Sequence, residues 1–303
     1  PQTGNIPEKK ISIVTTIFPE YDWVREILGD KADYADVTML LDNGVDLHSY
    51  QPTADDIIKI SDCDLFIYVG GESDGWVEDA LKEATNKNMQ VINLLDVLDS
   101  SVKEEVVVEG MEADEEEAED EEDGPEYDEH VWLSLKNATV LCEAISDALQ
   151  QIDPDNKDTY VANTVAYAQK FSALDGDYQA AVDAAAYKTV LFGDRFPFRY
   201  LVDDYGLSYY AAFVGCSAET EASFETILFL AGKVDELGLP CVLTIEGTQH
   251  KIAETIVQNT AEKNQKVLAM DSMQSTTSKD VANGTSYLSV MEQNLSVLKE
   301  ALG

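Results

Sequence analysis

The chain has 303 residues, of which 45% are hydrophobic and 9% aromatic, so it carries enough apolar surface for two lobes of about 150 residues each. Its formal charge is −39, from 59 acidic and 20 basic residues. This charge argues against nucleic acid, whose phosphates would be repelled, and against docking on anionic lipid by charge alone. No run approaches the roughly 18 apolar residues of a membrane-spanning helix.

The first ten residues, PQTGNIPEKK, are mostly polar and include two prolines, and the apolar run ISIVTTIFP follows at once. Such a beginning is typical of the flexible start of a mature secreted chain. We therefore expect an extracytoplasmic, secreted protein, lipid-anchored at the cell surface or periplasmic, whose signal or lipid-attachment segment lies outside this sequence.

In the first half, short apolar runs alternate with amphipathic stretches, which indicates βα units and a mainly parallel sheet. Strands are expected at 11–17, 35–40, 64–68 and 90–94. Helices are expected at 21–28, 54–60, 76–83 and 133–150, and Thr53 is expected to cap the second of them.

An acidic segment, residues 104–129, interrupts this pattern and contains no basic residue. Such a run cannot offset the entropy of ordering by burial, so we expect a mobile insert. It is either a solvated loop without a role or a weak, fast cation trap. Its carboxylate oxygens suit hard cations and would hold zinc only loosely.

A long helical pattern follows, from Pro154 to about Ala186, almost without a helix breaker. Asp153 is expected to cap it, and Pro154 suits the first helical position. At roughly 1.5 Å per residue the helix would be about 45–50 Å long, enough to join two lobes and to restrict hinge motion. The predicted domains are therefore an N-terminal lobe at 1–152, a connecting helix at 153–187 and a C-terminal lobe at 188–303.

The second half repeats the plan of the first. Strands are expected at 189–192, 208–213, 241–245 and 266–270. Helices are expected at 198–205, 224–237, 250–264 and 287–302. The sequence therefore predicts an α/β protein with two similar lobes, each built on a mainly parallel sheet.

The four cysteines are Cys63, Cys142, Cys216 and Cys241, and no two of them have C-x-x-C spacing. Neither a zinc knuckle nor a thioredoxin-type site is indicated. Because each lies among apolar or small residues, buried free thiols are favoured over disulfides.

Histidine is scarce, and His48, His130 and His250 each precede a predicted helix. Any one of them alone is explained as a surface residue or a satisfied polar side chain. All three at the starts of elements favour a shared site, because ligands of parallel α/β sheets gather at the carboxyl ends of strands.

Acidic residues stand at matching strand ends in the second half, namely Asp194, Glu246 and Asp271. Neutral imidazoles together with carboxylates suit zinc, manganese or iron. Each acid is equally explained as a helix cap or as an ion-pair partner, for which Arg195 is close by.

Two segments, HSYQPTADD and DEHVWLSLKNA, resemble the H-x-Y-x-P-T/S and D-x-H-x-W-L signatures of a known family. This family comprises the substrate-binding proteins of zinc and manganese ABC importers, the ZnuA- and TroA-like solute-binding proteins of cluster A-I. The resemblance covers nearly the whole chain, including VTTIFPEYDWV, SDCDLFIYVGG, FRYLVDDYGL and GCSAETEAS. It implies two βαβ lobes joined by one long helix, and a monomer that delivers a divalent metal to a membrane permease.

The resemblance also implies a ligand set. By position, His48 and His130 match the two ligands of the N-terminal lobe, and Asp271 matches the carboxylate of the C-terminal lobe. The third ligand, usually His or Glu, falls at Arg195, which stays protonated and cannot bind a metal.

Three outcomes of this departure are open: a neighbour replaces the ligand, binding is weaker, or Arg195 binds an anion and the metal function is lost. The strand order 2-1-3-4 expected of the fold places the turn from Glu246 to His250 between Arg195 and Asp271. We therefore expect His250 as the replacement, with Glu246 and Asp194 behind it. An ion pair between Glu246 and Arg195 is the alternative.

Alternatives remain open for both the metal and the function. Zinc-specific relatives often carry a histidine-rich loop where this chain is acidic. Three histidines with one carboxylate would indicate zinc, and two with two carboxylates manganese or iron. A metal-dependent surface adhesin is the alternative function. A metallohydrolase with Glu246 as general base is less favoured, because the G-x-S-x-G and H-E-x-x-H motifs and a phosphate-cradling glycine loop are absent from the sequence.

Overall fold

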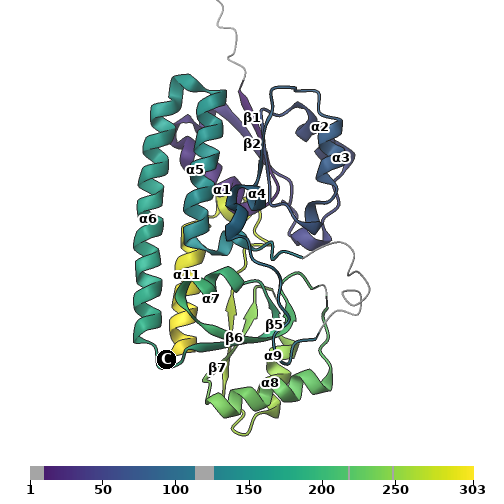
Figure 1. Ribbon diagram of the computed structural model, residues 1–303, viewed down its shortest axis with the longest axis vertical. Helices are drawn as coiled ribbons and strands as arrows, with labels where there is room; N and C mark the ends of the chain where they lie inside the picture. Colours follow the sequence, from purple (N-terminus) through teal and green to yellow (C-terminus); the bar gives the residue numbers. More distant parts are fainter. Residues whose placement is uncertain (1–9, 113–125, 218, 248) are drawn as a thin grey trace, which may run out of the picture. The chain divides into compact units, whose positions relative to one another are not determined.

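The structure is a computed structural model that describes residues 10–112, 126–217, 219–247 and 249–303 (Figure 1). Its contacts divide the chain into two compact units, each assembled from three separate stretches. Unit 1 comprises Pro1–Asp99, Thr139–Lys170 and Gln274–Tyr287. Unit 2 comprises Ser100–Ala138, Phe171–Met273 and Leu288–Gly303.

Unit 1 is built on a four-stranded parallel sheet in the order β2-β1-β3-β4. Its strands are β1 (Ile11–Thr15), β2 (Ala35–Met39), β3 (Leu65–Tyr68) and β4 (Gln90–Asn93). In the central register Ile13 pairs with Val37 on one side and with Leu65 on the other. All three side chains come from apolar runs that the sequence pattern had identified as strands.

The helices of unit 1 follow its strands in the expected order. They are α1 (Phe18–Leu28), α2 (Ala54–Asp62), α3 (Val77–Lys82), α4 (Leu94–Leu98) and α10 (Ser278–Ala282), and most of α5 (Leu135–Ile152) belongs here too. Thr53 caps α2 as predicted, because its hydroxyl accepts a hydrogen bond from the Asp56 amide at 3.2 Å. The short helices α4 and α10 were not predicted, since a single turn shows little periodicity.

Unit 2 repeats this topology with the strand order β6-β5-β7-β8, again fully parallel. Its strands are β5 (Thr189–Phe196), β6 (Ser208–Val214), β7 (Cys241–Ile245) and β8 (Lys266–Met270). Its helices include α7 (Arg199–Tyr205), α8 (Phe224–Leu237), α9 (Lys251–Asn259) and nearly all of α11 (Tyr287–Leu302). The predicted fold class and the 2-1-3-4 strand order are confirmed.

Helix α9 ends five residues earlier than the sequence pattern indicated. Thr260 leaves the helical conformation, with φ −77° and ψ 162°. Its hydroxyl donates to the Val257 carbonyl at 2.8 Å, which satisfies an end group of the helix. Asn259 is therefore the last helical residue.

The long helix is α6 (Lys157–Ala184), and it is about 42 Å long at 1.5 Å per residue. A 3₁₀ turn, Pro154–Asn156, precedes it, so the predicted single helix is divided at its start. The expected cap by Asp153 is wrong: its carboxylate accepts from the side-chain amide of Asn156 at 2.7 Å and from the Tyr160 hydroxyl at 2.5 Å, and from no backbone N–H of the turn.

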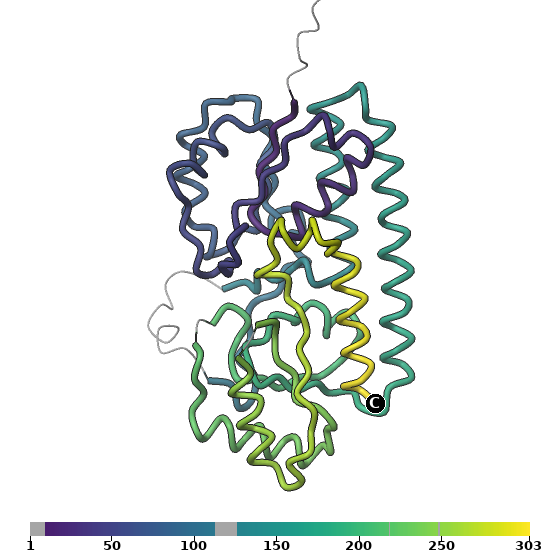
Figure 2. Tube along the Cα trace, turned by 180° about the vertical axis from the view of Figure 1, so that it is seen from behind, coloured from purple at the N-terminus to yellow at the C-terminus, as the bar shows by residue number. Residues whose placement is uncertain are grey.

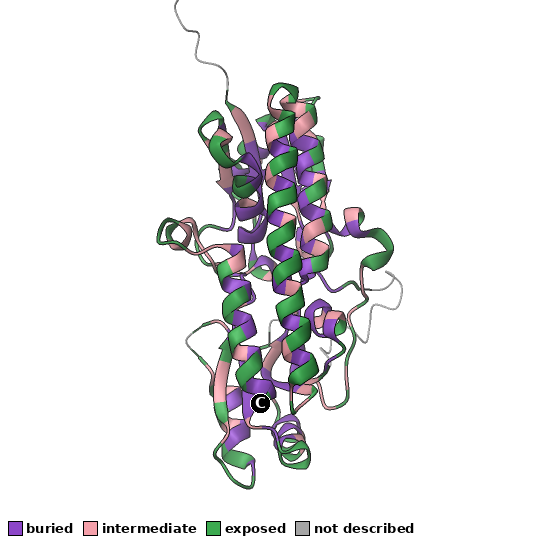
Figure 3. Cartoon of the chain, turned by 90° about the vertical axis from the view of Figure 1, so that its left-hand side faces the viewer, coloured by how far each residue is buried: buried purple, intermediate pink, exposed green. Residues whose placement is uncertain are grey.

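One stripe of α6 is buried, and the exposed residues lie on its other side (Figure 3). The stripe recurs every three or four residues and consists of Tyr160, Thr164, Tyr167, Phe171, Leu174, Tyr178 and Val182. The part from Phe171 onward belongs to unit 2, where α11 lies beside it (Figures 1 and 2). There the Tyr178 hydroxyl donates to the Met291 carbonyl at 2.6 Å.

The acidic segment is described at its two ends, and residues 113–125 lie outside the described part of the chain. The ends pair with each other: the Glu105 amide donates to the Glu126 carbonyl at 2.9 Å. The first end also reaches β6 in unit 2, because the Glu112 amide donates to the Ala212 carbonyl at 3.0 Å. Within the described ranges, the helices are all too short or too polar to cross a bilayer.

Candidate metal centre

His130 is the most constrained of the predicted ligands. It lies in unit 2 just before the 3₁₀ turn Val131–Leu133, and it is fully buried. One oxygen of Asp128, Oδ1, accepts both the His130 backbone N–H and the ring Nδ1–H, each at 2.9 Å. This bond favours the tautomer with its proton on Nδ1 and its lone pair on Nε2, the arrangement of a metal-binding histidine backed by a carboxylate.

The neighbouring charges of His130 shift its protonation. Burial, the largest influence, lowers the pKa of the imidazole, but the carboxylates of Asp128 and Glu129 outweigh it, and the pKa is raised overall. Arg195 acts in the opposite direction and lowers it. The pocket around His130 is therefore electronegative and favours a cation there.

The turn that carries His130 is itself anchored in unit 2. The indole N–H of Trp132, a fully buried residue, donates to the Ser272 carbonyl at 2.9 Å. The Asp128 carbonyl accepts the Tyr200 hydroxyl at 2.7 Å, and the Asp128 amide donates to the Lys103 carbonyl at 2.9 Å. The histidine and its carboxylate partner thus stand on a rigid support.

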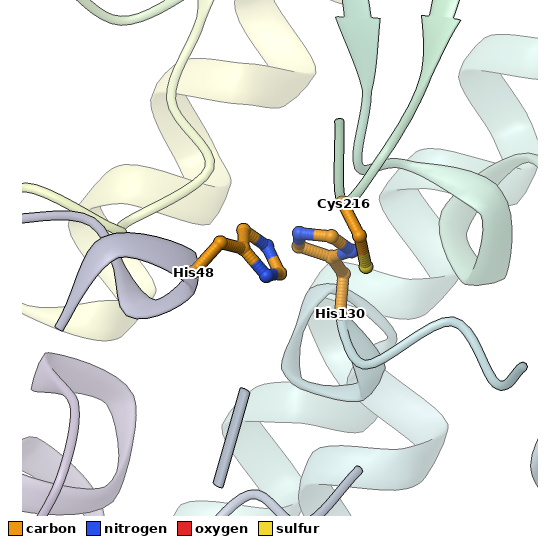
Figure 4. Close-up of side chains that lie close together, drawn as sticks. All are labelled: His48, His130 and Cys216. Atoms are coloured by element: carbon orange, nitrogen blue, oxygen red, sulfur yellow. The ribbon is translucent and has the colours of Figure 1, made fainter. Parts of the chain in front are cut away.

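Cys216 follows the carboxyl end of β6 and lies next to His130 (Figure 4). Its Sγ and a ring nitrogen of His130 lie within 4.8 Å of one another. Its amide donates to Oε1 of Glu105, in the acidic segment, at 3.1 Å. Burial, followed by the charges of Glu105 and Glu129, raises the pKa of the thiol well above its ordinary value.

Sequence reasoning did not select Cys216 as a ligand. All four cysteines are free thiols, as predicted; three are buried, and Cys216 is partly exposed. The signal available in the sequence was its place directly after a predicted strand, in the segment FVGCSAE. That place identifies it as a residue at the ligand-binding edge of the sheet.

Arg195 lies near the end of β5 and pairs in register with Phe213 of β6. Its guanidinium donates to the Ser217 carbonyl at 3.5 Å, and its amide donates to the Asp194 carboxylate at 2.9 Å. Arg195, which differs from the family pattern, therefore lies next to the loop that contains Cys216.

His250 and Asp194 meet through a threonine of β7. His250 stands just before α9, and its Nδ1 lies 3.3 Å from the Thr244 hydroxyl. This hydroxyl donates to Oδ2 of Asp194 at 2.6 Å. The same carboxylate oxygen accepts the Ile245 amide at 3.3 Å.

Glu246 and Asp271 follow the adjacent strands β7 and β8. The Glu246 carboxylate accepts the amide and the hydroxyl of Ser272, both at 2.7 Å. Oδ1 of Asp271 accepts the Met273 amide at 2.7 Å, while its own amide donates to Oδ1 of Asn294 at 2.8 Å. The structure thus brings the four second-half candidates to the carboxyl edge of one sheet.

His48 belongs to unit 1, within the 3₁₀ turn Leu47–Ser49 (Figure 4). Its amide donates to the Asp46 carboxylate at 2.9 Å, which caps the turn. Its Nδ1 lies 2.7 Å from the Ser73 hydroxyl. As in His130, an oxygen partner contacts the imidazole ring at Nδ1.

Comparison with known proteins identifies the family of this chain. The family model for ZnuA, described as the periplasmic component A of the zinc-uptake complex, matches residues 13–301. The zinc-binding lipoprotein AdcA of Streptococcus pneumoniae is 31% identical over 293 residues, which cover 96% of this chain and 56% of AdcA. The high-affinity zinc uptake system protein ZnuA of Bacillus subtilis is 28% identical over 97% of this chain and 88% of its own length. The chain thus spans about half the length of the AdcA relatives.

Solved structures agree with this similarity. The Zn(II)-bound ZnuA-like domain of Streptococcus pneumoniae AdcA superposes with a TM-score of 0.74 at 30% identity, covering 97% of this chain and 99% of that domain. The metal-dependent lipoprotein YcdH of Bacillus subtilis superposes with a TM-score of 0.77 at 26% identity, covering 97% of this chain and all of that one.

Proposed function

Because the chain belongs to the ZnuA family of periplasmic zinc-uptake components, we propose that it captures zinc outside the cytoplasm and delivers it to an ABC importer. The ion is its cargo, and the permease of the importer is its membrane partner. Manganese and iron are the alternative cargoes that the mixed imidazole and carboxylate donors admit. The lipoprotein relatives support a lipid-anchored form of the mature protein.

The observation that carries this proposal is the pairing of His130 with Asp128. A fully buried imidazole held through Nδ1 by a carboxylate at 2.9 Å has one lone pair with a fixed direction. Metal-binding histidines are oriented in this way, because the outer partner fixes the tautomer and increases the basicity of the donor nitrogen. The carboxylates of Asp128 and Glu129 add attraction for a cation.

The proposed ligands are those that the sequence pattern predicts. His48 and His130 supply imidazoles, and Asp271 supplies the carboxylate. For the position that Arg195 occupies in place of a ligand, the sequence offers His250, with Glu246 and Asp194 behind it. The hydrogen bonds of Glu246 to Ser272, and of Asp194 to Thr244, support a role for these two acids in positioning the neighbouring loops.

A receptor is favoured over an enzyme by the same geometry. A catalytic metal site needs an open coordination position and a general base close to it. Glu246 is the candidate base, but both of its oxygens accept hydrogen bonds from Ser272. The Glu246 carboxylate is thus engaged in holding Ser272, which is a positioning role.

Calorimetric titration of the whole chain with zinc, manganese and iron tests the proposal. We expect zinc to bind far more tightly than a Kd of about 1 μM. His48→Ala and His130→Ala should each weaken binding by more than about a hundredfold, since each removes a direct ligand. Gln258→Ala, an exposed polar change on α9, is the control and should leave the affinity unchanged. Affinity weaker than about 1 μM for all three metals would contradict the proposal.

A further inference from the structure

We propose that Cys216 is a ligand of the captured metal, bound as a thiolate beside His130, and that it replaces the donor lost at Arg195. The assignment deepens the proposed function and rests on it. It makes the donor set of this chain differ from the histidine and carboxylate set of its family pattern.

The first support is the distance between the two donors. Tetrahedral zinc, with bonds of about 2.05 Å to nitrogen and 2.3 Å to sulfur, holds these two atoms about 3.5 Å apart. Sγ of Cys216 and a ring nitrogen of His130 lie within 4.8 Å of one another, close to that separation.

The second support is the backbone that places Cys216. Gly215 passes so close to the imidazole that an added Cβ would lie 3.0 Å from Nδ1 of His130 and 2.9 Å from the Phe196 carbonyl oxygen. The absence of a side chain at this position lets the next residue reach the ring. The amide of Cys216 is held by Glu105, so the loop is fixed on both sides.

The position of Cys216 relative to Arg195 explains why the exchange is possible. The two residues lie at the carboxyl ends of the neighbouring strands β5 and β6, and the Arg195 guanidinium donates to the carbonyl of Ser217. A ligand lost from the end of one strand is thus regained from the end of the next.

The exchange also conserves charge. Replacing a neutral histidine by Arg195 adds one positive charge, and a thiolate at Cys216 adds one negative charge. The site with its ion therefore keeps the net charge that it would have with the family's histidine. When the sulfur–metal bond forms, the thiol releases its proton to solvent.

A thiolate changes which metals the site prefers. Sulfur is a soft donor that suits zinc, whereas manganese prefers carboxylate, carbonyl and water oxygens. Cys216 therefore favours zinc over manganese in a chain whose other donors would accept either.

Cobalt(II) is the probe that reports sulfur ligation directly. When it replaces zinc in the whole chain, we expect the near-ultraviolet charge-transfer absorption of a cobalt–thiolate bond. Cys216→Ser should abolish that absorption and weaken zinc binding by at least about tenfold, because even outer partners of a ligand contribute about 10- to 100-fold. Cys241→Ser, the same change at a buried thiol of unit 2, is the matched control and should keep both properties.

The outcomes separate this assignment from the proposed function. Tight cobalt and zinc binding without charge-transfer absorption would overturn the role of Cys216 and leave the receptor function standing. Zinc affinity that survives Cys216→Ser but is lost in His250→Ala would do the same and would assign the position to His250. Absence of any metal binding by the unmodified chain would overturn both.

Discussion

Asp128→Asn tests whether the carboxylate behind His130 contributes to metal affinity. The wild-type carboxylate accepts two hydrogen bonds through one oxygen, from the backbone and from the ring of His130, both at 2.9 Å. The amide keeps the size of the side chain but removes its charge, so the histidine becomes a weaker donor. Loss of such a partner costs about 10- to 100-fold in metal affinity, or about 1.4–2.7 kcal/mol.

The pH dependence of this effect has a definite sign. Asp128 raises the pKa of His130 against the opposing effect of burial, so the variant should have a lower pKa there. Protons compete with the metal for the ring below the pKa, and they compete more strongly in the wild type. The affinity ratio of wild type to variant should therefore be largest at alkaline pH and should shrink as the pH falls.

Competition with a zinc chelator at several pH values measures both effects. Asp177→Asn, at an exposed position of α6, makes the same chemical change away from the site and should leave the affinity unaltered. Equal zinc affinity of wild type and Asp128→Asn at alkaline pH, with both chains folded, would refute the view that Asp128 prepares the ligand.

Four further predictions concern stability and the site. Burial raises the pKa of Asp22 to about 6. The protein should therefore be more stable in acid and should lose up to about 3 kcal/mol of unfolding free energy as the pH rises from about 4 through 6. Urea unfolding of Asp22→Asn should show a flatter dependence of stability on pH. Gly193→Ala should lower the free energy of unfolding by about 1–3 kcal/mol, because the added Cβ would lie 2.5 Å from the Ala253 Cα. Gly232→Ala, whose Cβ meets no atom of the described residues within 4 Å, should instead raise the thermal midpoint by stabilising α8 by about 1 kcal/mol. Gly215→Ala should weaken zinc binding in calorimetry, because the new methyl group displaces the imidazole of His130. Unchanged binding would contradict this expectation.

The sequence by itself determined the α/β class, the element order and most element bounds. These properties follow from local periodicity and capping: β7, β8, α8 and α11 begin and end at the predicted residues. The errors lie where side chains override the local pattern, as at Asp153, which binds Asn156 and Tyr160, and at Thr260, which ends α9. His48 and His130 were predicted as ligands because their signatures are continuous in the chain.

Only the tertiary structure decided which donors surround His130. Parallel pairing of β5 with β6 brings Arg195 beside the loop that contains Cys216. This loop can approach the imidazole of His130 because Gly215 has no side chain. No periodicity in the sequence encodes such a meeting, because the residues are distant along the chain and their approach depends on strand register and on a missing side chain. The metal preference that we infer therefore depends on the packing of unit 2.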